Sequence, residues 1–115
     1  METKRTMETK RTIELYKSTQ QFLNDLNDQL IASVYGAIRK AEEELGVSRG
    51  HFRAIEEYMR APFGCRPTGV QAVECILGKT ESEEEYVEFR EDVFMGISHY
   101  RKVLTSEVKV IAKYL

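Results

Sequence analysis

Apolar side chains recur every three or four residues from Ile13 to Leu45, and no other feature limits the possible folds as strongly. An α-helix places residues three and four apart on one face, so this spacing predicts an amphipathic helix. No proline interrupts the segment, and Gly46 follows it where a glycine commonly ends a helix. We therefore expect one helix over residues 13–45, about 50 Å long at about 1.5 Å per residue.

A second apolar series with the same spacing runs to the end of the chain. It follows the pattern Ser82-x-x-Glu85, which is typical of a capping box at a helix start. Acidic residues crowd the expected first turn and lysines lie near the last, as the helix dipole favours. We expect a helix over about 83–115, in which Gly96 is unfavourable. The series comprises Tyr86, Phe89, Val93, Ile97, Tyr100, Leu104, Val108, Ile111 and Leu115.

Two shorter helices are expected between the long ones. Ser48 is a candidate N-cap for a helix over 48–61, which the following proline would end. Residues 62–69 contain both prolines of the chain and two glycines, so they are expected to form a loop. Thr68 is a candidate N-cap for a helix over 69–78.

The chain of 115 residues has the usual size of one domain. Residues 7–12 repeat residues 1–6 without change, and a polar unit of six residues has no core to bury. We expect residues 1–12 to form a disordered tail and residues 13–115 to form a single all-α domain.

The two long helices predict a homodimer. A compact chain of this length has a radius of gyration of about 13 Å, which helices of about 50 Å exceed. Two short helices cannot cover both long apolar faces, so we expect the long helices of two chains to pair in a helical bundle, a four-helix bundle across a two-fold axis. The expected dimer interface comprises Leu26, Leu30, Val34, Ile97, Leu104, Val108 and Ile111.

Residues 41–60 carry the most specific motif of the chain. Gly46 permits a left-handed turn, Val47 fills the corner and Ser48 can cap the next helix. The segment resembles the turn and second helix of a helix-turn-helix DNA-binding protein. An ordinary helical hairpin needs the same glycine and serine, and Glu42 occupies a position where the DNA-binding motif calls for a small residue.

The resemblance and the local composition lead to two functional expectations. A helix-turn-helix regulator would contact phosphates and base edges through Arg49, His51 and Arg53, although a net charge of −2 is unlike a dedicated nucleic-acid-binding protein. Arginines beside aromatic residues are also typical of protein interfaces. We favour a non-enzymatic protein with a regulatory or assembly role that binds a protein partner. The expected binding residues are Arg49, His51, Phe52, Arg53, Tyr58, Arg60, Phe63 and Arg66.

The sequence contains no motif that identifies a catalytic or cofactor site. It has two histidines, no Glu-x-x-His pair and no phosphate-binding glycine loop. Cys65 and Cys75 fit neither a disulfide framework nor a metal-binding spacing, so we expect reduced thiols. No apolar run approaches the length of about 18 residues of a membrane span, and the N-terminus lacks the apolar stretch of a signal peptide. We expect no catalytic residue, metal, cofactor, small-molecule substrate or membrane contact, and a cytoplasmic protein.

Overall fold

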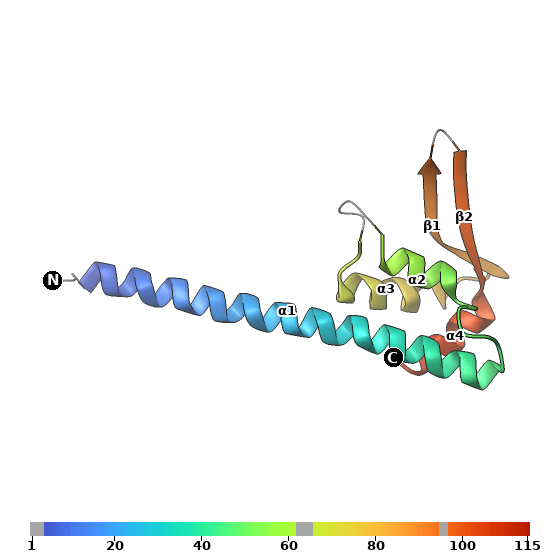
Figure 1. Ribbon diagram of the computed structural model, residues 1–115, viewed down its shortest axis with the longest axis horizontal. Helices are drawn as coiled ribbons and strands as arrows, with labels where there is room; N and C mark the ends of the chain where they lie inside the picture. Colours follow the sequence, from blue (N-terminus) through green and yellow to red (C-terminus); the bar gives the residue numbers. More distant parts are fainter. Residues whose placement is uncertain (1–3, 62–65, 95–96) are drawn as a thin grey trace.

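The chain forms four helices and a small two-stranded sheet within the residues that the computed structural model describes, which are 4–61, 66–94 and 97–115 (Figure 1). The mostly helical character agrees roughly with the expected all-α fold. In chain order the elements are α1 (Lys4–Leu45), α2 (Arg53–Met59), α3 (Gly69–Lys79), β1 (Tyr86–Phe94), β2 (Ile97–Leu104) and α4 (Thr105–Lys113).

Helix α1 has a free N-terminal half and a packed C-terminal half. Every residue from Glu8 to Leu26 is exposed, whereas Asn27 and Leu30 already lie against the start of α3. The free half therefore extends away from the rest of the molecule (Figure 1), and the radius of gyration is 19.5 Å. Residues 4–12 belong to α1, although the sequence analysis expected a disordered tail there.

The C-terminal end of α1 lies at Leu45, as the sequence predicts. Gly46 has a φ of +67°, which is the left-handed conformation that glycine adopts without strain. The N–H of Val47 donates to the carbonyl of Glu42 at 3.1 Å, and the N–H of Gly46 donates to the carbonyl of Glu43 at 3.3 Å. These two hydrogen bonds form a Schellman motif, which satisfies carbonyls that the helix end would leave unpaired.

Helix α2 is shorter than the sequence predicts, because it begins at Arg53 and not near Ser48. Gly50 has a φ of +95°, so a regular helix cannot run through this position. The N-cap of α2 is Phe52, without a side-chain cap, and the carbonyl of Ser48 accepts a hydrogen bond from His51 in the preceding turn. The prediction that Ser48 caps this helix is wrong.

Helix α3 confirms its predicted start. The Thr68 hydroxyl accepts from the N–H of Gln71 at 3.1 Å, and the Gln71 side chain accepts from the N–H of Thr68 at 2.9 Å. This reciprocal pair is a capping box. The helix ends at Lys79, one residue after the predicted end.

A β-hairpin replaces most of the long helix predicted over 83–115. Strands β1 and β2 pair antiparallel from Tyr86 opposite Leu104 to Phe94 opposite Ile97, and only α4 is helical. The register shifts between Glu88 and Arg90, where β1 has one more residue than β2 and forms a bulge. Gly96, the unfavourable residue of the predicted helix, lies outside the described residues.

The sequence of the hairpin suits a half-buried strand as well as a helix. Val87, Phe89 and Val103 are buried, while Glu88 and Lys102 are exposed, so residues alternate between two faces. β-branched and aromatic residues also favour strands. The predicted capping box at Ser82 is absent as well, because its hydroxyl accepts from the N–H of Glu84 in a turn.

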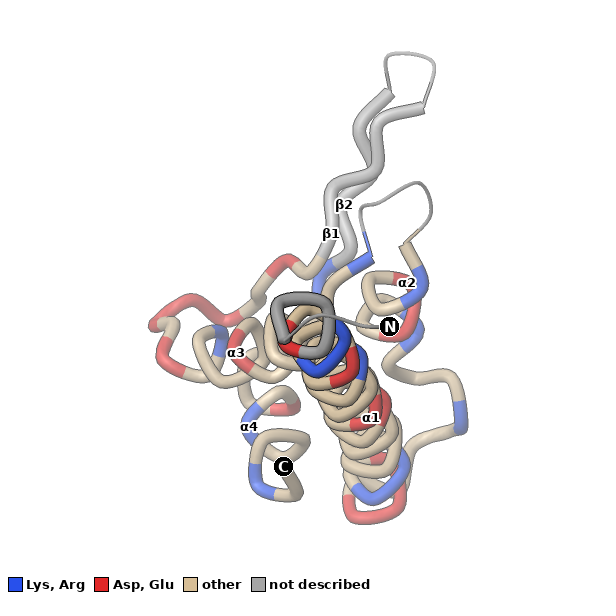
Figure 2. Tube along the Cα trace, turned by 90° about the vertical axis from the view of Figure 1, so that its left-hand side faces the viewer, with Lys and Arg blue, Asp and Glu red and all other residues tan. Residues whose placement is uncertain are grey.

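The core lies where the packed half of α1 meets α2, α3, α4 and the base of the hairpin. Seen nearly along α1, α3 and α4 lie on one side of this helix and α2 on the other (Figure 2). Glu44, at the end of α1, pairs with Lys113 and accepts from the Tyr114 hydroxyl at 2.7 Å. These contacts attach the C-terminus of the chain to α1. The largest fully buried side chains are Phe52, Ile38, Ile55, Ile76, Ile111, Val34 and Val108.

Candidate interaction surfaces

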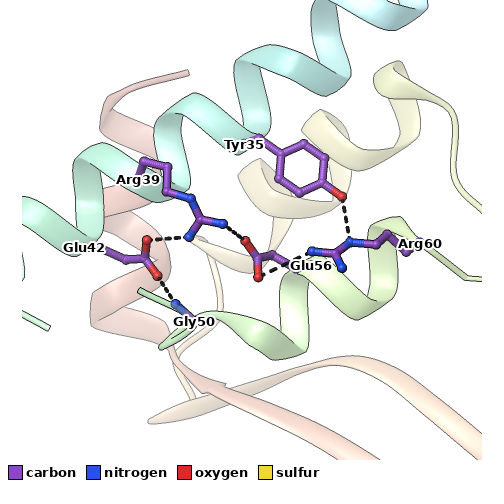
Figure 3. Close-up of polar contacts among 6 residues, drawn as sticks. All are labelled: Tyr35, Arg39, Glu42, Gly50, Glu56 and Arg60. Atoms are coloured by element: carbon purple, nitrogen blue, oxygen red, sulfur yellow. Dashed lines mark hydrogen bonds and ion pairs between the residues drawn. The ribbon is translucent and has the colours of Figure 1, made fainter. Parts of the chain in front are cut away.

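A network of ion pairs holds the corner between α1 and α2 (Figure 3). The Arg39 guanidinium donates to Glu42 Oε1 at 2.6 Å and to Glu56 Oε1 through its other terminal nitrogen. Glu42 Oε2 also accepts from the N–H of Gly50 at 2.9 Å. Both carboxylates are buried, and the hydrogen bond with Glu42 raises the pKa of Arg39. The network therefore joins α1, the turn and α2, and it supplies hydrogen-bond partners to two carboxylates that could not be buried alone.

Arg60 extends this network to the far end of α2. Its Nε donates to the Tyr35 hydroxyl at 3.3 Å, and its Nη2 lies 3.7 Å from Glu56 Oε2 (Figure 3). The hydrogen bond with Tyr35 is the main cause that raises the pKa of Arg60. Arg60, which we expect to contact a partner, also links the end of α2 to α1, while its side chain remains 64% exposed.

Among the described residues, Arg49, Arg53 and Arg66 are the expected binding residues with exposed side chains that form no hydrogen bond or ion pair. Arg49 and Arg53 flank the same turn, and Arg66 lies on the segment that leads to α3. His51 is also exposed, but its Nε2 lies 2.8 Å from Glu107 Oε2 of α4. Arg49 and Arg53 are thus exposed at the corner, where the exposed Glu43 lines one hollow together with Arg49.

The aromatic residues expected to contact a partner do not form a surface patch. Phe52 is 0% exposed and lies in the core, so its ring stabilises the fold and cannot meet a partner. Tyr58 packs against Phe89 with ring centroids 5.9 Å apart. Burial, followed by contact with Cys75, raises the pKa of Tyr58 to about 12. Phe63 lies outside the described residues.

The expected dimer interface is divided among several environments. Val34, Val108 and Ile111 are fully buried inside one chain, because α4 packs on α1 of the same chain. A second copy cannot reach them in this fold. Leu30 and Leu104 are half-buried, Leu26 is exposed, and the side chain of Ile97 lies outside the described part of the chain.

Among the described side chains, the free half of α1 carries the largest group of exposed apolar residues on one element. Five of them share one broad helix face, in which two neighbouring rows each repeat at helical steps of four or seven residues. Only Leu26 of this group was among the expected site residues. The sequence offers one signal for the others. The apolar face of the long helix is longer than two short helices can cover, so part of it had to remain exposed. The free apolar face comprises Leu15, Tyr16, Phe22, Leu23 and Leu26.

Comparisons with protein-family models, with curated proteins and with solved structures gave no significant match to this chain. Among the described residues, no three side chains of His, Cys, Asp or Glu gather in a way that could hold a metal ion. In the same part of the chain, no helix is both long and apolar enough to cross a membrane.

Proposed function

We propose that this protein is non-enzymatic, with an assembly or regulatory role, and that it acts by binding another protein along the free half of α1. The observation that supports this proposal is the free apolar face. Phe22 is 65% exposed and Leu15 is 69% exposed, on a helix whose other half lies in the core. Contiguous apolar surface of this kind is typical of protein interaction sites.

The length of the free helix supports the same proposal. An isolated helical segment is marginal in water, because its nucleation is unfavourable and tertiary packing supplies most helix stability. Within the free half, Gln20 pairs with Asn24 at 3.1 Å and Gln21 pairs with Asp25 at 3.0 Å. Such pairs contribute only about 0.2 to 0.5 kcal/mol each. A bound partner would supply the missing packing.

The proposed interface differs from the one expected over residues 48–69. Phe52 and Tyr58 contribute to the core, and Arg60 is used between α2 and α1. The exposed apolar side chains that the centre of an interface requires therefore lie on α1.

Photo-crosslinking tests this proposal. A benzophenone amino acid replaces Tyr16, which lies on the free apolar face, in cells that produce the full chain. The matched control places it at Lys17, on the opposite side of the helix. We expect adducts with a protein from Tyr16 and few from Lys17. The absence of any protein adduct at Tyr16, with the chain folded, would overturn the proposal.

A second candidate function is DNA binding by the α1–α2 corner. Exposed Arg49 and Arg53 favour it, and so does the burial of the Glu42 carboxylate, which accepts from Arg39 and from the N–H of Gly50. A gel shift with duplex DNA at low and physiological salt tests this function. Binding through phosphates would weaken steeply with salt and with Arg53→Ala, because each contact releases counterions. Protein binding along the free apolar face would tolerate salt.

A further inference from the structure

The free half of α1 contains a seven-residue pattern in addition to its apolar face. Leu15, Thr19, Phe22 and Leu26 are separated by steps of four, three and four, which is the spacing of a coiled-coil seam. Arg11, Ser18 and Asp25 are seven residues apart, so they form a row along one edge of this seam. All three are exposed. The row changes from basic to acidic through a neutral serine.

We propose that the partner of the free half is a second copy of this chain, bound antiparallel, with Arg11 of each copy beside the partner's Asp25. The two Ser18 residues then lie near the two-fold axis. This inference rests on the proposed function, since it identifies the protein that covers the free apolar face.

The orientation follows from which edges of the two helices meet. In an antiparallel pair, equivalent edges face each other, so the row of Arg11, Ser18 and Asp25 faces the same row in reverse order. In a parallel pair this row faces the opposite edge of the seam, where Tyr16 and Leu23 lie. Only the antiparallel pair places opposite charges together, and charges at such edges select orientation in coiled coils.

The charges of the whole segment favour the same orientation. Residues 4–17 contain five basic and two acidic residues, whereas residues 18–30 contain two acidic and no basic residues. Antiparallel pairing places the basic segment of each chain beside the acidic segment of the other. Parallel pairing would align like charges over the full length.

The shape of the chain permits this arrangement. The packed part of α1 begins near Asn27, while residues 8–26 are exposed and span about 28 Å at about 1.5 Å per residue. If residues 8–26 of two chains overlap antiparallel, the two packed bodies lie at opposite ends of the helix pair. The apolar face of each chain is then covered along the exposed residues.

Sedimentation equilibrium of the full chain and its variants tests the inference. We expect a dimer for the unchanged protein and a monomer for Phe22→Glu. Arg11→Asp and Asp25→Arg should each raise the dimer dissociation constant about tenfold, because two attractive pairs become two repulsive ones. The double variant should return to within about threefold of the unchanged protein, since the opposite charges are restored in exchanged positions.

Two controls match these charge changes on the opposite side of the helix. Lys17→Asp changes the net charge as Arg11→Asp does, and Asp28→Arg changes it as Asp25→Arg does. Neither should alter the dissociation constant by more than about twofold.

A chain that stays monomeric at the highest soluble concentration would overturn the inference, and so would a double variant no tighter than the single ones. If Tyr16 then still gives crosslinks to a different protein, the proposed function stands with another partner. If Tyr16 gives no protein adduct, the proposed function fails as well.

Discussion

The two halves of α1 present apolar faces of similar spacing to different surroundings. In the packed half, Val34, Ala37, Ile38 and Ala41 are at most 2% exposed, and two of these four residues are alanines that allow close approach. In the free half the face consists of leucines and aromatic residues, which are at least 39% exposed. The difference shows that periodicity identifies a face to be covered, while residue size and neighbouring elements decide which part of the chain, or which molecule, covers it.

The largest effect should separate two identical substitutions, one in the body and one on the free half. Phe52→Ala removes a fully buried ring and should lower the free energy of unfolding by about 3 to 5 kcal/mol. Phe22→Ala should leave unfolding of the body unchanged and weaken association instead. Urea denaturation with circular dichroism and sedimentation measure the two quantities. Equal losses of unfolding free energy would contradict the division into two halves.

Loss of the corner network should have the next largest effect. Arg39→Met leaves the buried carboxylates of Glu42 and Glu56 without their shared cation, so it should destabilise the protein by about 2 to 3 kcal/mol. The matched control is Lys17→Met in the free half, which removes a cation on the side of α1 away from the free apolar face and should change the unfolding of the body by less than about 0.5 kcal/mol. Chemical denaturation gives both values, and a silent Arg39→Met would show that the network does not hold the corner.

Two glycine-to-alanine substitutions should change the stability in opposite directions, because one glycine lies in close contact and the other faces open space. A Cβ at Gly69 would lie 2.6 Å from the Leu30 Cβ and 2.7 Å from the Asn27 carbonyl oxygen, so Gly69→Ala should cost about 1 to 3 kcal/mol. A Cβ at Gly36 meets no atom within 4 Å, so Gly36→Ala should stabilise α1 by up to about 1 kcal/mol. Thermal melting of both variants provides the test. Equal shifts of the two melting temperatures would refute the close approach of α3 to α1.

The smallest effect should be a pH dependence at the end of the packed half. Hydrogen bonds from Lys113 and Tyr114 lower the pKa of Glu44. The contact therefore stabilises the fold while Glu44 is ionised, and this stability is lost as the pH falls through the lowered pKa. Glu44→Gln should be slightly less stable than the unchanged protein at pH 6, and the difference should shrink towards pH 3. Thermal melts across this range, with Glu14→Gln as the control, measure it; a constant difference would contradict the assignment.

Local patterns predicted the end of α1 and the start of α3 well, but they predicted the start of α2 and the last part of the chain badly. Gly46 and Thr68 act through hydrogen bonds to neighbouring residues, so their roles can be read from the sequence. The segment from Tyr86 to Leu104 fits a helical and a strand period equally. Its structure depends on packing of Val87, Phe89 and Val103 with α2 and α4, which no local pattern contains.

The candidate site could be predicted only in part for a similar reason. Arg49 and Arg53 are at the surface, as expected from their position in the turn. Phe52 was expected at the surface but is fully buried, because it packs in the core, which residue type alone does not reveal. The free apolar face was visible as periodicity, yet periodicity alone did not separate its residues from those that α3 and α4 cover.

The sequence by itself determined that the chain is mostly helical, that α1 is long and amphipathic, and where α1 ends and α3 begins. Spacing and caps act over a few residues, so these features need no knowledge of distant contacts. Only the tertiary structure decided that residues 86–104 form a hairpin and that α4 packs on α1 of its own chain. It also showed that half of α1 remains uncovered, because burial depends on which segments meet in space and the free energy of packing exceeds local preferences.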